Sequence, residues 1–370
     1  MRPTTIRVPA DCATLQMAVD FASEGDTIEI SAGEYEENVI IKTGLTIRAS
    51  CSPVEIRSSD ETEPIVLVDS ECGKVTFEGV AFLGKAGSHS RPQTAIQITC
   101  GDVSLRNCLF KGWETPASLA DWLAGVGDED GEACFRPHQG SPAIVVSGSP
   151  SALEARDCQF TDSDFGIVVM GGARASIRGC EFRDYGVAVS VERGSITSKR
   201  NAVLNGGTLV AVGPEAQVDS QYDSVVGSTL LYCSNGSGST VTFSHATVDS
   251  YHLRSLTIGK SNVHPGPDGR WLWNTTRVII TDSIVCIHSD EPATCSYAPS
   301  AGEWGPPQLD AWNGIEFCGS NLLYAPPDFP GPHPRFGRII GSELSLQPNS
   351  PAIGAASDGT NLGAWQGNME

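Results

Sequence analysis

Acidic side chains that could carry acid–base chemistry gather in two segments of the chain, residues 111–142 and 286–313. Hydrolysis of a glycosidic bond needs two carboxyl groups about 5 to 10 Å apart, one of them with a pKa raised by an apolar setting. If the chain cleaves glycans, we expect the acid and the base or nucleophile among four residues, which are Asp121, Glu132, Glu303 and Asp310. The chain has 44 Asp and Glu residues, so an ordinary surface acid is the competing interpretation of each.

Tryptophan is concentrated in the same two segments and in the shorter stretch 263–274. An indole face stacks on sugar rings, and an indole also anchors a loop against an apolar surface, so both roles stay open. The candidate substrate-binding tryptophans are Trp113, Trp122, Trp271, Trp273, Trp304 and Trp312. The run from Asp128 to Asp130 leaves calcium open as a cofactor, although it lacks the alternating ligand spacing of a dedicated calcium loop. No other cofactor is indicated.

A line of cations is predicted on another face, because one basic residue recurs at the same position of successive repeat copies. These residues are Arg106, Arg156, Arg178 and Lys199. Like charges about 5 Å apart repel unless something neutralises them. Nearby acids would give a solvated salt-bridge ladder of little energetic weight, and the acids in question are Glu154, Asp157, Glu181 and Glu192. The alternative is an anionic ligand such as sulfate, phosphate or a uronate chain.

The element that must position these side chains is a repeat of about 22 residues. LEARDCQF (153–160) and ASIRGCEF (175–182) share alternating apolar residues, a small residue and a final aromatic residue. The small residue recurs as Cys158, Cys180, Asn201, Asp223 and Ala246, in steps of 22, 21, 22 and 23. Two or three short strands per period predict a parallel β-solenoid with coils about 4.8 Å apart. We expect the small residues to turn the corners and stack, with the cysteines as small buried hydrophobes.

A second strand in each copy begins with Gly or another small residue and has no charge at its outward positions. These positions include Val145, Val168, Met170, Ala188, Val210, Val212 and Leu231. An apolar outer face indicates a surface covered by loops, a homo-oligomer interface or a groove for an apolar ligand.

The N-terminal residues predict the cap that a solenoid needs over its first coil. Asp11 is expected to N-cap a helix over 12–23, with Leu15, Val19 and Ala22 on one face. VPADCATLQMAVDFASEGDTIEI (8–30), SAGEYEENVIIKTGLTIRAS (31–50) and the closing SPAIGAASDGTNLGAWQ (350–366) resemble the pectin-lyase-like right-handed parallel β-helix superfamily, in particular its bacterial-type members.

The resemblance implies an all-β fold, a single-stranded right-handed parallel β-helix with an N-terminal capping helix and two inserted loops. We expect one domain over 1–370, with the cap in 1–50, the inserts at 111–142 and 286–313, and a closing segment in 321–370. Catalytic motifs of the characterised relatives are missing from the sequence, including the N-T-D and G-H-G of polygalacturonases and the G-R-P-W of pectin methylesterases. The resemblance therefore transfers no catalytic residue.

Composition narrows the choice of partners. A net charge of -20 repels nucleic acid and anionic membranes. The sequence contains no run of 18 apolar residues, so we expect no membrane span. The N-terminus shows no signal peptide, so we expect a cytoplasmic protein unless a leader was removed.

Three functions remain as hypotheses, and whether the chain is an enzyme stays open. The leading one is a polysaccharide- or oligosaccharide-acting protein of lyase, glycoside hydrolase or epimerase type. The second is a non-catalytic glycan-binding or structural β-helix. The third is an isomerase or lyase for a small apolar substrate bound on the apolar outer face.

Overall fold

The computed structural model describes residues 3–60, 62–84, 93–113, 141–233, 238–249, 256–258, 263–265, 271–273, 277–286, 315–324, 336–340, 343–347 and 349–364. These residues form two units, with those up to Val189 in the first and those from Ser190 onward in the second. Among them, no helix is long and apolar enough to cross a membrane. The prediction of a single domain over the whole chain stays a prediction.

The first unit holds the one helix of the described residues and the strands up to β15, within which the boundary falls. Its elements are β1 (Thr5–Val8), α1 (Leu15–Phe21), β2 (Thr27–Ile30), β3 (Gly33–Glu36), β4 (Val39–Ile41), β5 (Thr46–Ala49), β6 (Val54–Arg57), β7 (Val66–Glu78), β8 (Ala81–Leu83), β9 (Ile96–Arg106), β10 (Leu109–Trp113), β11 (Pro142–Ser147), β12 (Ala152–Arg156), β13 (Gln159–Met170), β14 (Arg174–Arg178) and β15 (Glu181–Glu192).

The second unit continues with strands alone. They are β16 (Ser195–Lys199), β17 (Ala202–Leu204), β18 (Thr208–Val212), β19 (Gln217–Gln221), β20 (Ser224–Val226), β21 (Thr229–Cys233), β22 (Thr240–Ser244), β23 (Thr247–Asp249), β24 (Leu256–Ile258), β25 (Val263–Pro265), β26 (Trp271–Trp273), β27 (Arg277–Thr281), β28 (Ile284–Cys286), β29 (Ile315–Cys318), β30 (Leu322–Tyr324), β31 (Phe336–Ile340) and β32 (Glu343–Leu346).

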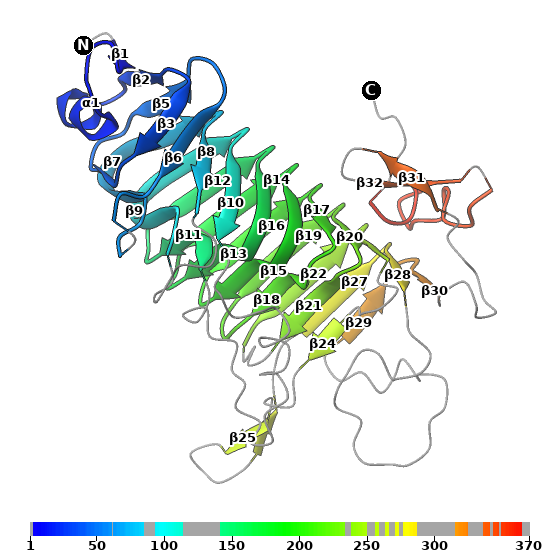
Figure 1. Cartoon of the computed structure of the whole chain (residues 1–370). Coiled ribbons are helices and arrows are strands. Elements are labelled where there is room, and N and C mark those ends of the chain that lie inside the picture. The colour runs from blue at the N-terminus through cyan, green and yellow to red at the C-terminus, as the bar shows by residue number, and fades with distance from the viewer. Residues whose placement is uncertain are drawn as a thin grey trace. The chain divides into compact units, whose positions relative to one another are not determined.

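Each unit is a stack of coils, and the strands of the coils pair in parallel with their equivalents in the next coil (Figure 1). In the first unit, Arg106 of β9 pairs with Arg156 of β12, and Arg156 pairs with Arg178 of β14. In the second, β16, β19, β22 and β27 pair in the same way. Of the described strands, β25–β26 and β31–β32 form antiparallel pairs. The predicted right-handed parallel β-helix is therefore confirmed.

We predicted that the small residue of each repeat turns the corner between strands. In the structure, the residue before it makes the turn. Asn107 and Asp157 of the first unit have φ of 52° and 53°, in the left-handed region. In the second unit Arg200, Tyr222 and His245 hold the equivalent position with φ of 54°, 58° and 53°. The small residue then starts the next inward-facing stretch and stacks on its equivalents.

The interior of the first unit contains two stacks that run from coil to coil. Phe82, Phe110, Phe160 and Phe182 are fully buried, with successive ring centroids 5.1, 4.8 and 4.6 Å apart. The second stack consists of Cys108, Cys158 and Cys180, which are free thiols and at most 2% exposed. The predicted role of these cysteines as small buried residues is confirmed.

In the second unit the equivalent column starts with two buried polar residues, Asn201 and Asp223, which precede Ala246. Asp223 is fully buried, and the hydroxyls of Ser198 and Ser220 each donate to its Oδ2 at 2.6 Å. The backbone N–H and the side-chain amide of Asn201 donate to Oδ1 at 2.7 and 3.1 Å. Burial outweighs these hydrogen bonds and raises the pKa of Asp223 to about 6.

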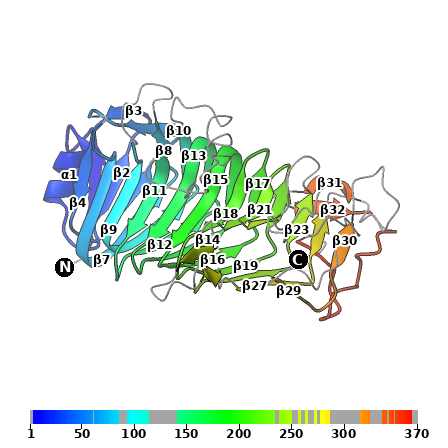
Figure 2. The ribbon, with the colours of Figure 1, turned by 90° about the horizontal axis from the view of Figure 1, so that it is seen from below.

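Helix α1 lies against the first coils, beside β4 (Figure 2). It is shorter than predicted, and Thr14 rather than Asp11 is its N-cap, with the Thr14 hydroxyl accepting from the N–H of Met17. Asp11 is not available as a cap, because its carboxylate accepts the N–H of Arg7 in β1. The carboxylate of Glu37 completes the helix start by accepting two N–H groups, at 2.9 and 3.1 Å.

Side chains of the cap also close the exposed edge of β4. The amide of Gln16 accepts the N–H of Ile40 at 2.7 Å and donates to its carbonyl at 3.3 Å. At β1, the carbonyl of Arg7 accepts the N–H groups of Asp11 and Cys12. The capping role predicted for this segment is therefore present, with different residues at the helix start.

Candidate functional site

The outer face of the strands that start with small residues is largely covered. In the first unit Val168 and Ala188 are 2% and 0% exposed, and in the second Val210, Val212 and Leu231 are at most 1% exposed. Of the three interpretations of this face, a surface covered by other residues fits these positions. None of the five side chains is exposed enough to line an open groove for a small apolar substrate.

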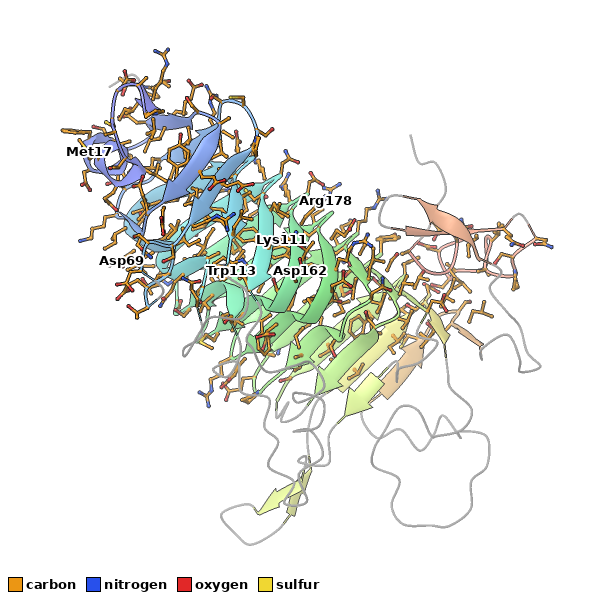
Figure 3. All side chains as sticks on the ribbon, in the orientation of Figure 1. Met17, Asp69, Lys111, Trp113, Asp162 and Arg178 are labelled. Carbon is orange, nitrogen blue, oxygen red and sulfur yellow. The ribbon has the colours of Figure 1, made fainter. Side chains whose placement is uncertain are left out.

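A different face of the first unit exposes the predicted line of cations. Arg106, Arg156 and Arg178, which we call the basic stripe, occupy one register position in β9, β12 and β14. The side chains of Arg106 and Arg156 are 51% and 50% exposed, and Figure 3 shows Arg178 at the outer rim of the coils. Adjacent coils of a parallel sheet are about 4.8 Å apart, so the stripe presents one guanidinium per coil.

Two members of the basic stripe have acidic partners. Arg106 pairs with Glu78 at 3.3 Å, and Arg156 pairs with Glu154. Glu154 also accepts from Lys74 of β7 at 2.8 Å, and these hydrogen bonds, the one from Lys74 first, lower its pKa. The predicted salt-bridge ladder is thus present at Glu154, whereas Glu181 and Glu192 pair instead with neighbours on their own strands or turns.

Arg178 differs from the other two members. No carboxylate of the described residues lies within ion-pair distance of its guanidinium. Lys199, the fourth predicted cation, belongs to the second unit, where its ammonium lies 5.7 Å from the ring centroid of Tyr222. The register partners that follow Lys199 in that unit, Gln221 and Ser244, are uncharged. The line of stacked arginines at one register position is therefore a feature of the first unit.

Trp113 is the predicted sugar-stacking residue that the structure places, and it lies inside the coil. Its side chain is 1% exposed, and a Cβ on Gly84 of the preceding coil would approach its ring to 3.0 Å. Trp113 ends strand β10 and fills the room that Gly84 leaves, so residues 111–113 of the predicted first insert belong to β10. A ring buried in this way has no face open to a sugar, so the stacking role is wrong for Trp113.

A small charged group lies on the surface near Trp113, as Figure 3 shows. Lys111 and Asp162 form an ion pair at 3.9 Å, with side chains 58% and 42% exposed. Asp162 has a φ of 53°, at the bend between the two halves of β13. The sequence reasoning missed this pair, but the recurrence of Asp two residues after Phe160 and Phe182 was a usable signal.

The predicted catalytic carboxylates and most of the tryptophans stay predictions, because they lie outside the described residues. These are Asp121, Glu132, Glu303, Asp310, Trp122, Trp304 and Trp312. For Trp271 and Trp273 the structure describes the backbone of β26 alone. The acidic residues 128–130, from which a calcium site was predicted, also lie outside the described residues. Within the described part, no group of three or more His, Cys, Asp or Glu is arranged to hold a metal ion.

No protein-family model matches the sequence, and no curated protein does. Solved structures to which the chain is similar are right-handed parallel β-helix proteins. One is the periplasmic alginate epimerase AlgG, with 10% identity, a TM-score of 0.38, and 87% of this chain and 83% of that chain covered. A second is pectate lyase Pel9A, with 10% identity, a TM-score of 0.39, and 100% of this chain and 97% of that chain covered. A third is the pectin methylesterase of Yersinia enterocolitica, with 10% identity, a TM-score of 0.35, and 91% of this chain and 95% of that chain covered.

Proposed function

We propose that this chain is a carbohydrate-active β-helix protein that binds an extended anionic glycan along the basic stripe of its first unit. The observation that supports this proposal is the stacking of three exposed arginines, one per coil, in a protein whose net charge is -20. A glycan of uronate residues carries one carboxylate per sugar ring, so its charges recur along the chain as those of the stripe do. Arginine is suited to this contact because its planar fork matches a carboxylate.

The ion pairs already present along the stripe do not oppose such binding strongly. Glu78 and Glu154 meet the stripe at the surface, where side chains are 28% to 51% exposed. Exposed ion pairs of this kind contribute about 0 to 1 kcal/mol. An incoming carboxylate can therefore replace either partner at little cost, and Arg178 has none of these partners to release.

The proposal includes catalysis of lyase, hydrolase or epimerase type, with the acid and base drawn from the inserts. The predicted candidates for these roles remain Asp121, Glu132, Glu303 and Asp310. A non-catalytic glycan-binding protein is the competing form of the same proposal, and it uses the same stripe. The two differ in whether a bound polymer is changed.

One experiment tests both parts. The protein is incubated with polygalacturonate, alginate and a neutral glucan, and binding, reducing ends and unsaturated-uronate absorbance are followed. We expect the double variant Arg156→Ala, Arg178→Ala to bind the acidic polymers roughly tenfold more weakly, at about 0.5 to 1 kcal/mol per arginine, with a smaller salt dependence. Arg183→Ala is the matched control, because that arginine is exposed to a similar extent but lies in β15, outside the register position of the stripe, and pairs with Glu181.

Unchanged binding by the double variant, or equal binding of the neutral glucan, would refute the basic stripe as the glycan site. Binding without new reducing ends or unsaturated products would leave the non-catalytic form.

A further inference from the structure

The closing segment of the second unit, residues 350–364, lies along three successive coils as a strap. Its apolar residues Ala352, Ala356 and Leu362 pack with Ile284 of β28 in one buried cluster. The N–H of Ala364 donates to the hydroxyl of Thr247 at 2.8 Å. The strap is therefore attached at one end by a hydrogen bond to β23 and along its length by apolar contact.

Polar contacts fix the middle of the strap at two corner residues. Asp282 accepts the N–H and the hydroxyl of Ser357 at 2.9 and 2.6 Å, and the N–H of Ser320 at 2.9 Å. One coil earlier, Nε2 of His245 lies 3.2 Å from the hydroxyl of Thr360 and 3.6 Å from the carboxylate of Asp358. The strap thus rests on one carboxylate and one imidazole.

The hydrogen bonds around Thr360 fix how the imidazole is used. The Thr360 hydroxyl donates to Oδ1 of Asp358 at 2.6 Å, so it is an acceptor toward His245. Nε2 of His245 is then the N–H donor, and a second proton would enter at Nδ1. Protonation keeps the existing hydrogen bond and adds a positive charge beside Asp358.

On the side that faces the strap, two carboxylates would attract a positive charge on the His245 imidazole. Asp358 faces it directly, and Asp282 lies at the equivalent corner of the next coil. Burial raises the pKa of Asp282, but the hydrogen bonds from Ser357 and Ser320 together with the charge of His245 outweigh it and lower the pKa. The same His245 charge adds to the hydrogen bonds of Thr360 that lower the pKa of Asp358. Both carboxylates are therefore available as anions next to the imidazole.

On the opposite side of His245, two basic side chains lie beyond the ring of Tyr222. Its ring stacks on Tyr222 with centroids 4.7 Å apart, and Lys199 and Arg200 lie 5.7 and 5.8 Å from the centroid of the same tyrosine. The His245 side chain is 9% exposed.

We propose that His245 is a proton-operated latch, which tightens the strap over residues 350–364 when the imidazole is protonated and loosens it when the imidazole is neutral. Histidine is the side chain that ordinarily changes charge between pH 5 and 8. The added ion pair with half-exposed Asp358 is worth up to about 1 kcal/mol, which is up to about fivefold in the open population of the strap. The strap is therefore more closed in mild acid than at pH 8.

Hydrogen exchange of the intact protein tests the latch. At pH 5.5 we expect the amides of Ser357, Gly363 and Ala364 to exchange about threefold to fivefold more slowly than at pH 8, after correction for the intrinsic effect of pH. In His245→Asn this difference should disappear, and asparagine suits the corner because it tolerates the φ of 53°. Asp358→Asn keeps the imidazole and should also remove most of the difference.

Asp223→Asn is the control, because the pKa of buried Asp223 is raised to about 6 and this residue lies one coil before His245, directly after Tyr222. The latch predicts that this variant keeps the pH difference at the strap. The proposal is overturned if the corrected exchange of the wild-type strap is the same at both pH values, or if the difference survives in His245→Asn, or if it disappears in Asp223→Asn instead.

Discussion

The buried carboxylate of Asp223 makes the stability of the second unit depend on pH in a direction that the structure determines. The pKa rises from an ordinary value of 3.8 to about 6 because the carboxylate is removed from water. The folded state therefore binds the proton more tightly than the unfolded state. The stabilisation by the protonated form is fully present below pH 3.8 and is lost as the pH rises through about 6.

The magnitude follows from the change in pKa. Each tenfold change in proton affinity corresponds to about 1.4 kcal/mol, so the rise to about 6 corresponds to roughly 3 kcal/mol over the whole range. About 2 kcal/mol of this lies between pH 4.5 and 7.5. Asp223→Asn has nearly the same shape and does not titrate, so wild type should lose about 2 kcal/mol relative to this variant across that interval.

The assay is urea unfolding of both proteins at several pH values, with hydrogen exchange in β19 and β22 to report on the second unit. Comparing the two proteins cancels the titration of groups that they share. Asp219→Asn, at a half-buried position of β19, makes the same chemical change where solvent reaches the side chain. A difference between wild type and Asp223→Asn that is constant with pH, or that moves in favour of wild type as pH rises, would refute the reasoning.

Two further predictions concern the interior and the corner of the first unit. Phe160→Ala should lower the free energy of unfolding by about 3 to 5 kcal/mol, because the ring is fully buried between two stacked neighbours. Chemical denaturation measures this change. Phe21 is 70% exposed, so the control Phe21→Ala should change the free energy of unfolding by less than about 0.5 kcal/mol. Gly84→Ala should lower the melting temperature, because its Cβ would meet the carbonyl oxygen of Gly112 at 2.2 Å. Gly213→Ala should have a smaller effect, because its Cβ would approach Cβ and Cγ of Glu192 no closer than 3.1 Å.

The repeat could be predicted from the sequence because every coil reuses the same side-chain space. Phe110, Phe160 and Phe182 fill one column, so the period of the chain is visible as a period of aromatic residues. The corner residues give a weaker signal. Asn107, Asp157 and Gly179 are residue types that tolerate a positive φ, but Tyr222 and His245 adopt the same backbone conformation in the second unit.

The basic stripe was likewise predictable, and its ion pairs were not. The alignment of the repeat copies placed Arg156 beside Arg106 and Arg178, as the strand register does. Lys74, however, reaches Glu154 across a sequence separation of 80 residues, which no short-range pattern reports. The position of Trp113 was missed for a related reason, since the space it fills is created by Gly84 in another coil.

The way the N-terminal cap holds β1 and β4 bears on how this protein behaves at high concentration. A parallel ladder that ends in free peptide groups is a template on which a second molecule can add strands, and repeated addition produces fibres. Here Asp11 and Cys12 occupy the outward peptide groups of Arg7, and Gln16 occupies both of those of Ile40. At these two residues the chain's own side chains and turn occupy the positions that an added strand would use, so a second molecule has fewer places at which to begin.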